Sequence, residues 1–424
     1  KKKGLVKMGR FFKGAAAAIG IVTIGIMGLV GFYSYTLPDF YYVSDGNQLT
    51  VNSVFSISSR PSEQTLQAVE ALEGNTAMNT HDREASLSKL EDSTLMLFGT
   101  VPIKDVQTGQ ISRPKLVPCG QPFGIKLVTE GVMVIDLERF EGCCPASECG
   151  IKKGDVIISV NGVGVTTNKS ISDIISGSKG KPCTVEYRSG DNEKTATLTP
   201  VYHDGSYKAG MWVRDSSAGI GTLTFYDPST GAFGGLGHPI CDADTKLPLP
   251  LSQGSVGEVR ITGFNKSVKG DPGQLLGEFS SSASVGNIDF NNESGVFGTL
   301  NSPPSSSKPI ELGFRQEVHT GEAVIYTTID NGKPKEYKIN IEKADLSSDA
   351  EHDLIVKITD PKLLETTGGI LQGMSGSPII QDGRLVGAVT HVFIDDPQQG
   401  YGIFADSMYR QSTKCVDPEL GMAG

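Results

Sequence analysis

The pattern of apolar and polar positions begins with an uncharged run over residues 14–38 that follows a short basic segment. The basic segment holds Lys1, Lys2, Lys3, Lys7, Arg10 and Lys13. A helix needs about 20 apolar residues to cross a bilayer, and residues 14–35 supply that length. Because the cations stand on one side only, residues 1–13 are predicted to stay cytoplasmic and the bulk of the chain to be translocated. The pattern predicts a single-pass transmembrane signal-anchor at residues 14–35, with a cleaved signal peptide as the alternative.

Residues 39–95 are polar and weakly patterned. Short strands are predicted at residues 40–43 and 49–57, and one short helix at residues 63–72. Residues 58–92 are typical of a loosely ordered spacer. Residues 36–112 as a whole are predicted to form an extracytoplasmic stalk and self-cleavage region. Exposed polar segments of this kind are where proteases cut most readily.

Apolar alternation sharpens between residues 95 and 200. The run Cys-Gly-Ile-Lys-Lys-Gly-Asp-Val-Ile-Ile-Ser-Val-Asn-Gly at 149–162 precedes a predicted helix at 168–175 and predicted strands at 183–188 and 195–200. This order resembles a PDZ domain of the bacterial protease-associated form, placed at residues 113–200. In that family a hydrophobic-Gly-hydrophobic loop, matched here by Phe123-Gly124-Ile125, presents N–H groups to a peptide C-terminus that binds by strand addition. The alternative is a small packing domain that binds no peptide.

Strands and turn residues alternate from residue 201 to about residue 410, which is typical of an all-β barrel arrangement. The pair Pro303-Pro304 marks a loop, a predicted junction between two sub-barrels. Composition agrees with this interpretation, since 52 glycines and 22 prolines favour a protein rich in strands and loops. Residues 201–424 are therefore predicted to form one mainly β domain.

Charge and cysteine content exclude several classes of function. The formal net charge of −10 argues against nucleic acid as a partner. No glycine fingerprint opens a predicted helix, so no cofactor is expected. The seven cysteines include no Cys-x-x-Cys pair that would indicate zinc, so no metal is expected either. An exported chain permits disulfides, but an odd number of cysteines favours mostly free or locally paired thiols.

The candidate chemistry lies in residues 368–391, which are predicted to form a glycine-rich loop, a serine, a strand, an Asp-Gly turn and a second strand. Ser375 stands in a Gly-x-Ser-Gly element that bares a hydroxyl and leaves backbone N–H groups free to bind an oxyanion. A serine hydroxyl needs a base to become a nucleophile. His238 is the favoured base because its glycine-rich strand fixes the imidazole and leaves it accessible. His391, on the strand that leaves the hairpin, is interpreted as lining a substrate groove.

The hairpin resembles the nucleophile hairpin of chymotrypsin-like serine proteases, which it matches without a gap. Met374 replaces the aspartate of that family and Ser377 replaces its second glycine, so activation through a new N-terminus is not expected. The resemblance implies a chymotrypsin-like double β-barrel, an oxyanion hole made by the N–H groups of Gly373 and Ser375, and a substrate pocket at Gly369, Thr390 and His391. No acid stands at Gly369, so the expected P1 residue is small or apolar rather than Lys or Arg.

The order of segments carries a more specific resemblance. An N-terminal anchor, a PDZ domain, the Gly-Leu-Gly-His-Pro-Ile-Cys-Asp motif at 235–242 and the Ser-Gly-Ser-Pro hairpin together resemble the stage IV sporulation protein B family of serine peptidases. The resemblance implies a serine endopeptidase in the space between the mother-cell and forespore membranes, which processes itself within its N-terminal region. It implies cleavage of a regulatory protein in a membrane complex, so that an intramembrane protease can activate a late sigma-factor precursor. The PDZ domain would take peptide C-termini or the protein's own N-terminal region, and self-cleavage would release the enzyme from the membrane.

By the same resemblance the catalytic triad is His238, Asp360 and Ser375. The chain order of a chymotrypsin-like enzyme is kept, but the aspartate of such an enzyme usually stands much farther from the serine. Four other aspartates are alternatives. Asp289 and Asp345 have a spacing from the serine that suits that fold, and Asp242 and Asp244 lie close to His238 in sequence. Asp360 also precedes Pro361, where an aspartate commonly starts a turn. The acid therefore rests mainly on the resemblance.

Three other functions compete with the signalling peptidase. A PDZ-containing quality-control protease of the cell envelope usually has its protease domain first, whereas here the PDZ domain comes first. A catalytically inactive PDZ scaffold would show no cleavage that depends on Ser375. An esterase would place its nucleophile on an elbow between a strand and a helix, whereas strands are predicted after Ser375.

Overall fold

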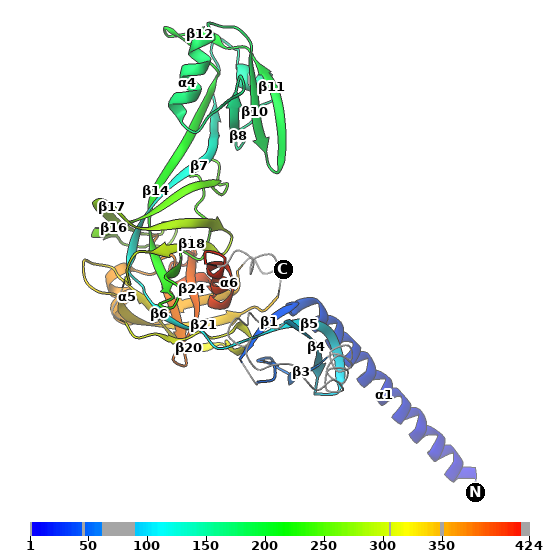
Figure 1. Cartoon of the computed structure of the whole chain (residues 1–424). Coiled ribbons are helices and arrows are strands. Elements are labelled where there is room, and N and C mark those ends of the chain that lie inside the picture. Colours follow the sequence, from blue (N-terminus) through cyan, green and yellow to red (C-terminus); the bar gives the residue numbers. More distant parts are fainter. Residues whose placement is uncertain (1, 45–46, 62–89, 305–306, 348–351, 417–424) are drawn as a thin grey trace, which may run out of the picture. The chain divides into compact units, whose positions relative to one another are not determined.

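The computed structural model describes residues 2–44, 47–61, 90–304, 307–347 and 352–416. Strands predominate among these residues, and the mainly β fold class predicted from the sequence is confirmed. The chain divides into two compact units (Figure 1). The first unit comprises Lys1–Pro114, Glu311–Gly321 and Ile341–Ile355, and the second comprises Lys115–Ile310, Glu322–Asn340 and Val356–Gly424.

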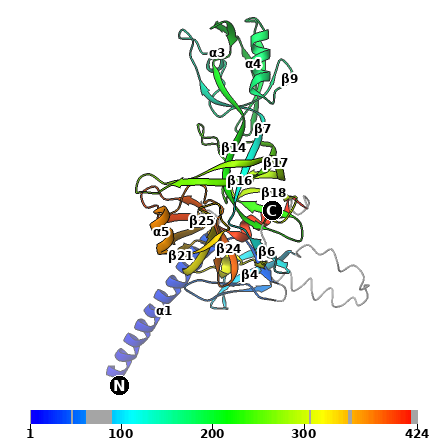
Figure 2. The ribbon, with the colours of Figure 1, turned by 90° about the vertical axis from the view of Figure 1, so that its left-hand side faces the viewer.

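The first unit begins with helix α1, Lys2–Thr36, which carries the N-terminus in Figure 2. Its segment Ala16–Thr36 has a mean hydropathy of 2.0 and is long enough and apolar enough to cross a membrane. Large apolar side chains of this segment are exposed, Ile21 and Ile24 among them. The apolar helix predicted at residues 14–35 is therefore present.

Five strands follow α1 and form one sheet in the order β1-β5-β4-β3-β2. Their bounds are Phe40–Ser44 (β1), Thr50–Val51 (β2), Ile57–Pro61 (β3), Leu90–Leu97 (β4) and Val101–Ile111 (β5). Alternate side chains enter the core of this unit, where Tyr41, Leu95 and Leu97 are buried. The described part of residues 36–112 is thus a packed sheet. The strands predicted at residues 40–43 and 49–57 are present in part as β1, β2 and β3, and most of the spacer predicted at residues 58–92 lies outside the described residues. Each short strand buries only alternate residues, so its apolar signal in the sequence is weak.

The helix predicted at residues 63–72 lies outside the described residues. Later residues of the first unit are held to its earlier part by Arg113, which donates to Glu317 at 2.7 and 2.9 Å. Glu317 ends the 3-10 helix η1, Arg315–Glu317. The guanidinium also lies 4.3 Å from the ring centre of Phe314, so charge and stacking fix the same side chain.

The second unit contains a small domain with the strands and helices expected of a PDZ fold, drawn at the top of Figure 1. Its elements are the second half of β7 (Pro122–Leu137), α3 (Pro145–Glu148), β8 (Val156–Val160), β9 (Val163–Gly164), α4 (Asn168–Gly177), β10 (Cys183–Ser189), β11 (Asn192–Leu198), β12 (Val201–His203), β13 (Ser206–Lys208) and the first half of β14 (Met211–Tyr226). Val134, Ile157 and Ile171 lie in its core. Thr167 and Ser170 form a reciprocal capping box that starts α4 at the predicted place.

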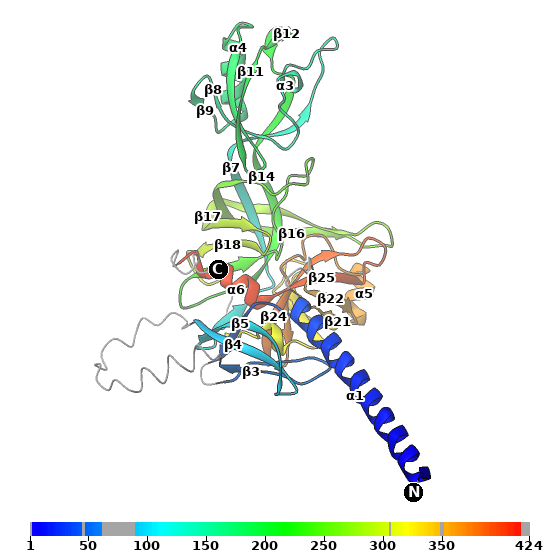
Figure 3. The same ribbon diagram turned by 90° about the vertical axis from the view of Figure 1, so that its right-hand side faces the viewer.

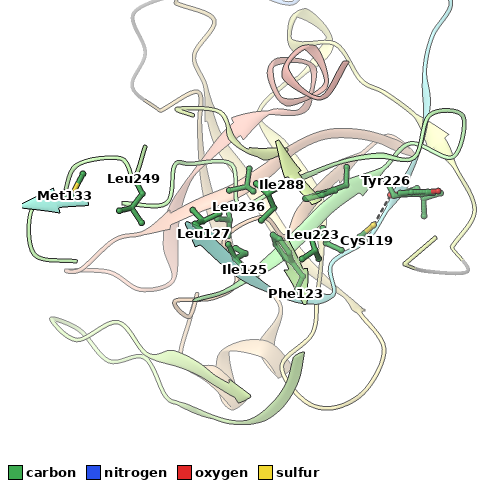
Figure 4. Packing of buried hydrophobic residues seen from close by; sticks show 14 of the residues in the cluster. Cys119, Phe123, Ile125, Leu127, Met133, Leu223, Tyr226, Leu236, Leu249 and Ile288 are labelled. Atoms are coloured by element: carbon green, nitrogen blue, oxygen red, sulfur yellow. Dashed lines mark hydrogen bonds between the residues drawn. The ribbon is translucent and has the colours of Figure 1, made fainter. Parts of the chain in front are cut away.

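A closed barrel follows in the same unit, formed by six strands in the order β7-β16-β17-β18-β15-β14, with β14 pairing back to β7. The new strands are β15 (Ala232–Gly235), β16 (Leu251–Asn265), β17 (Gln274–Asn292) and β18 (Gly295–Leu300), and the short strands β6 (Lys115–Pro118) and β19 (Ile310–Glu311) continue the sheet from β14. Figure 4 shows the apolar core of this barrel, in which Phe123, Leu223 and Leu236 are buried.

The PDZ domain is inserted into this first barrel. Strands β7 and β14 pair along both domains. In the PDZ domain, residues 133–137 of β7 pair with residues 211–214 of β14, and in the barrel, residues 122–128 of β7 pair with residues 216–222 of β14. The predicted boundaries of the PDZ domain, residues 113 and 200, are therefore displaced at both ends. Sequence order alone hides an insertion, because each long strand looks continuous in its apolar pattern.

Phe123, Gly124 and Ile125, predicted to form the peptide-binding loop of the PDZ domain, lie instead in the barrel half of β7. Ile125 pairs with Gly219 of β14 on one side and with Val256 of β16 on the other. A strand with neighbours on both sides has no open edge to offer a peptide. A Cβ atom on Gly124 would lie 2.2 Å from the Phe279 ring, so a side chain at this position would clash with the core of the barrel.

A second closed barrel forms in the order β20-β21-β22-β25-β24-β23. Figure 3 labels four of its strands, β21, β22, β24 and β25. Its strands are β20 (Gly321–Thr327), β21 (Lys335–Ala344), β22 (Leu354–Ile358), β23 (Pro378–Gln381), β24 (Arg384–Val392) and β25 (Gln399–Phe404), and the helices α5 (Pro361–Thr367) and α6 (Ala405–Thr413) accompany it. Asp382 and Gly383 both have positive φ in the turn between β23 and β24, as a two-residue hairpin requires. The predicted double barrel and its serine hairpin are confirmed.

Candidate active site

A pocket of about 660 Å³ brings together residues from both barrels. Ser375 and the preceding Gly373 reach it from the second barrel, and His238 reaches it from the loop after β15 of the first. Thr390 and His391 of β24 complete the group. The structure therefore brings together five of the residues singled out from the sequence, across 137 residues of chain between the histidine and the serine.

The serine loop is held by β14 of the first barrel. The Thr222 amide donates to Ser375 O at 3.0 Å and the Thr222 hydroxyl donates to Gly373 O at 2.8 Å. The Thr224 hydroxyl donates to Gly376 O, also at 2.8 Å. Sequence reasoning missed both threonines, because a threonine inside a strand carries no signal that distinguishes it from others.

Met374 occupies the place where chymotrypsin-like enzymes have an acid. Its side chain is fully buried, and its sulfur accepts a long hydrogen bond from the Leu371 amide at 3.3 Å. The loop is therefore fixed by an apolar anchor rather than by an ion pair.

The backbone N–H groups of Gly373 and Ser375 indicate an oxyanion site. The amides of Met374 and Gly376 donate to Leu371 O at 3.0 Å and to Val389 O at 2.7 Å. Within the described residues, the amides of Gly373 and Ser375 have no acceptor. Unsatisfied donors beside a serine hydroxyl are the arrangement that stabilises a tetrahedral oxyanion.

The Ser375 hydroxyl donates to Thr390 O at 2.5 Å. It makes no hydrogen bond to His238 in this state. The Nδ1 atom of His238 lies 2.9 Å from Pro239 O. Because a carbonyl only accepts, this contact places the proton on Nδ1 and leaves Nε2 as the basic nitrogen.

The surroundings keep His238 in its basic form. Burial lowers the pKa of His238 below its ordinary value, and the hydrogen bond with the Pro239 carbonyl opposes that effect only in part. The ring of His391 lies against it, with ring centres 4.4 Å apart and planes inclined by 35°. A neutral imidazole is the protonation state that a general base requires.

Asp360 is not brought to His238. Its carboxylate caps α5, where it accepts from the amides of Lys362 and Leu363 at 3.0 Å each, and it also accepts from the Lys338 amide at 3.4 Å. Asp-Pro at a helix start is a favourable capping pair. The predicted Asp360–His238 contact is therefore absent here, and the turn-forming role weighed for Asp360 is the one that its hydrogen bonds support.

The four alternative aspartates also have other partners. Burial raises the pKa of Asp242, but the amides of Thr245 and Asp244 and the Arg214 guanidinium outweigh it and hold that pKa below its ordinary value. Arg214 pairs with Asp244 as well, at 2.8 Å. Asp289 contacts Cys415 and Asp345 pairs with Lys343. Among the described residues, no carboxylate is hydrogen-bonded to His238.

The lining of the pocket agrees with an apolar substrate residue. Ile370, Leu371 and Val392 supply apolar side chains, and no Asp or Glu is among the described residues that line the pocket. Gly369 does not face it. A Cβ atom on Gly369 would lie 2.2 Å from Pro397 O, so this glycine allows a close backbone approach beneath the pocket.

A second hydrophobic-Gly-hydrophobic segment, Ala209-Gly210-Met211, lies at the start of β14 in the PDZ domain. Gly210 has a φ of +73°, and residues 211–214 pair with β7 alone among the described strands, which leaves their other edge toward α4. The amides of Ala209 and Gly210 have no acceptor within the described residues. Sequence reasoning missed this segment although it has the same pattern as Phe123-Gly124-Ile125.

Comparisons with known proteins agree with these two domains. Residues 205–409 match the family model described as SpoIVB peptidase S55, and residues 144–189 match the PDZ domain model. The putative zinc metalloprotease LL2128 of Lactococcus lactis is 36% identical over 89 residues, which are 21% of this chain. The chain spans only 19% of the length of that relative.

Several solved structures are similar to parts of the chain, and two of them represent its two domains. The PDZ domain of an SdrC-like protein from Listeria monocytogenes is 22% identical, with 20% of this chain and 87% of that one covered and a TM-score of 0.18. The active form of the Rv3671c protease from M. tuberculosis is 15% identical, with 47% of this chain and 75% of that one covered and a TM-score of 0.27.

Proposed function

We propose that this chain is a serine endopeptidase, because residues 205–409 match the SpoIVB peptidase S55 model and residues 144–189 match the PDZ model, and that it acts as a membrane-anchored signalling peptidase of sporulation. The observation that carries the catalytic proposal is the shared pocket of Ser375 and His238, with the free amides of Gly373 and Ser375 beside them. The apolar helix α1 supports the membrane anchor, with the N-terminus cytoplasmic and the bulk outside. Release from the membrane would follow self-cleavage in the N-terminal region.

The proposed mechanism begins when substrate binding turns the Ser375 hydroxyl from Thr390 O toward His238. Nε2 of His238 takes the hydroxyl proton while Oγ attacks the scissile carbonyl. The amides of Gly373 and Ser375 then bind the oxyanion, an interaction typically worth about 2.7–4 kcal/mol for each donor. His238 gives its proton to the leaving amine, and water completes hydrolysis of the acyl-enzyme by the same steps.

The proposed substrate is a regulatory protein of a membrane-bound protease complex, whose cleavage lets an intramembrane protease activate a late sigma-factor precursor. The family match supports this proposal, and the apolar lining of the pocket favours cleavage after small or apolar residues. Quality control of the cell envelope is the second candidate. It is favoured only by the combination of protease and PDZ domain, which such enzymes share.

The PDZ domain is proposed to bind peptide C-termini or the protein's own N-terminal region. The proposed groove would lie between the open edge of β14 at residues 211–214 and helix α4. The amides of Ala209 and Gly210 would receive the terminal carboxylate, and residues 211–214 would pair with the peptide backbone.

The test compares the wild-type chain in detergent with Ser375→Ala and Ser377→Ala, using a peptide library and mass spectrometry. Ser377 is the matched control, since it is a buried serine two residues away whose hydroxyl has no partner among the described residues. We expect Ser375→Ala to lower kcat by at least about 10⁴-fold and Ser377→Ala to remain active. Unchanged cleavage by Ser375→Ala would refute the catalytic proposal.

The same digestion maps the specificity. Predominant cleavage after Lys or Arg would contradict an apolar pocket without an acid. Shortened forms of the chain itself that vanish in Ser375→Ala would support self-processing, and forms that persist would assign the cuts to another protease.

A further inference from the structure

The peptide group that joins Pro239 to Ile240 lies between the proposed base and a side chain from another strand. Its carbonyl oxygen accepts from Nδ1 of His238 at 2.9 Å. Its N–H group donates to Oδ1 of Asn291 at 2.7 Å. One planar amide therefore links the imidazole to a carboxamide.

Asn291 holds this amide by more than one bond. Its Nδ2 group donates to Ile240 O and to Leu249 O, each at 3.0 Å. Three hydrogen bonds fix the orientation of the carboxamide, because only Oδ1 can accept from an N–H group and only Nδ2 can donate to the two carbonyls. Asn291 belongs to β17, next to the strand β18 that pairs with it. The loop after His238 is thus anchored to the wall of the first barrel.

From this geometry we propose that Asn291 is a positioning residue of the peptidase, which orients His238 through the Pro239–Ile240 amide. The inference rests on the catalytic role proposed for Ser375 and His238. In this structure the imidazole is hydrogen-bonded through Nδ1 to Pro239 O, and the amide that carries this oxygen is held by Asn291. The amide fixes the Nδ1–H tautomer, which leaves Nε2 to accept the serine proton.

The chain of hydrogen bonds also affects charge. When His238 accepts the serine proton it becomes a cation, and its Nδ1–H bond to Pro239 O strengthens. An amide whose N–H donates to another acceptor is a better acceptor at its own oxygen, because hydrogen bonds in series polarise one another. Asn291 therefore stabilises the imidazolium at a distance of one peptide group. Its effect should be smaller than that of a carboxylate in direct contact.

Other ionisable groups near the ring set the background for a pH experiment. His391 of β24 stacks on the ring, Cys241 lies on the same loop, and Arg214 and Lys246 line the same pocket. None of them is changed by substitution of Asn291. A shift in the acidic limb of the pH profile is then attributable to the Pro239–Ile240 link.

The experiment measures kcat and KM of the full chain on a cleaved library peptide, as a function of pH, for Asn291→Ala and Asn291→Asp. Asn292→Ala is the matched control, because Asn292 bonds to Gln411 and to the Ser294 amide but not to the histidine loop. For Asn291→Ala we expect kcat to fall by about 10- to 100-fold with KM changed little, by analogy with other supporting-residue losses.

Asn291→Asp keeps an acceptor for the Ile240 amide and adds negative charge behind it. A negative charge favours imidazolium, so the acidic limb of kcat/KM should move to higher pH while kcat at high pH exceeds that of Asn291→Ala. A merely structural role would lower activity in both variants without moving the limb, and that result would overturn the inference. Wild-type kcat and pH profile in both variants would overturn it as well.

Failure of the inference is distinguishable from failure of the proposed function. If the wild-type chain shows no cleavage that depends on Ser375, the proposed function fails. If that cleavage is present and Asn291 variants behave like Asn292→Ala, only the role of Asn291 fails. Thermal unfolding of each variant is recorded alongside, so that activity is compared among folded proteins.

Discussion

The two barrels assemble their shares of the active site from segments at very different distances along the chain. In the second barrel, Gly373, Ser375 and Thr390 all belong to a single hairpin and the loop before it. In the first barrel, His238 depends on Asn291, and the serine loop depends on Thr222 of β14. A PDZ domain also separates β7 from most of β14 in sequence. The contrast teaches that local parts of a site leave a signature in sequence, whereas parts joined only by folding do not.

Among the substitutions that test this contrast, the largest effect is expected from Gly376→Ala, which disturbs the contact between the two barrels. A Cβ atom on Gly376 would lie 2.0 Å from Thr222 O and 2.6 Å from Leu236 N, both backbone atoms of the first barrel. Its φ of +97° adds strain for any other residue. Displacing the serine loop by even about 1 Å should lower kcat/KM by about 100-fold or more. Peptide hydrolysis and thermal unfolding measure the two consequences.

Gly383→Ala is the control, because Gly383 lies on the same hairpin with positive φ but with nothing within 4 Å of its Cβ position. It should cost about 1 kcal/mol of stability from backbone strain and leave kcat/KM nearly unchanged. Equal losses of activity in both variants would show that the hairpin, rather than its contact with the first barrel, sets the position of the serine.

The sequence predicted the double barrel, the serine hairpin and His238 because each has a local pattern. The hairpin needs positive φ at Asp382 and Gly383, and an Asp-Gly pair in the sequence predicts such a turn. The PDZ groove was misplaced because Phe123-Gly124-Ile125 and Ala209-Gly210-Met211 share one pattern, and only strand pairing tells a barrel strand from an open edge. Asn291 was missed for the same reason. Its role arises from bonds to a loop that folding brings beside it.

Substitutions at Asp360 give an effect of intermediate size within the second barrel. Asparagine caps a helix about as well as aspartate, whereas alanine costs about 0.5–2 kcal/mol. Asp360→Ala should therefore destabilise the protein, and Asp360→Asn should restore both stability and kcat/KM. A triad acid behaves otherwise, since its replacement by asparagine lowers kcat by about 10⁴-fold. Denaturant unfolding and peptide hydrolysis of the two variants separate the cap from the acid.

A loss of that size in a fully stable Asp360→Asn protein would show that the active state rearranges to bring Asp360 to His238. The second barrel would then contribute a base-orienting group as well as the nucleophile, and the contrast drawn between the barrels would fail.

The smallest effect on catalysis is expected from Gly210→Ala in the PDZ domain. This substitution tests whether peptide binding by the inserted domain is independent of hydrolysis in the barrels. A Cβ atom there would lie 2.8 Å from Glu138 O, and the φ of +73° is unfavourable for alanine. The loop should shift and lose its aligned amides. Binding to library peptides with free C-termini should weaken by about 10-fold or more, because charge-assisted hydrogen bonds to the carboxylate are lost. Hydrolysis of short peptides should stay at the wild-type rate.

Gly190→Ala in the turn between β10 and β11 is the matched control, with positive φ and nothing within 4 Å of its Cβ position. Amidated peptides test the role of the carboxylate directly. If they bind as well as free C-termini, or if Gly210→Ala binds like Gly190→Ala, the groove beside β14 is not the recognition site. If Gly210→Ala instead slows hydrolysis of short peptides, strain in the PDZ half of β14 reaches Thr222 and the serine loop. In that case a change in the inserted PDZ domain displaces the active site, because strand β14 belongs to both.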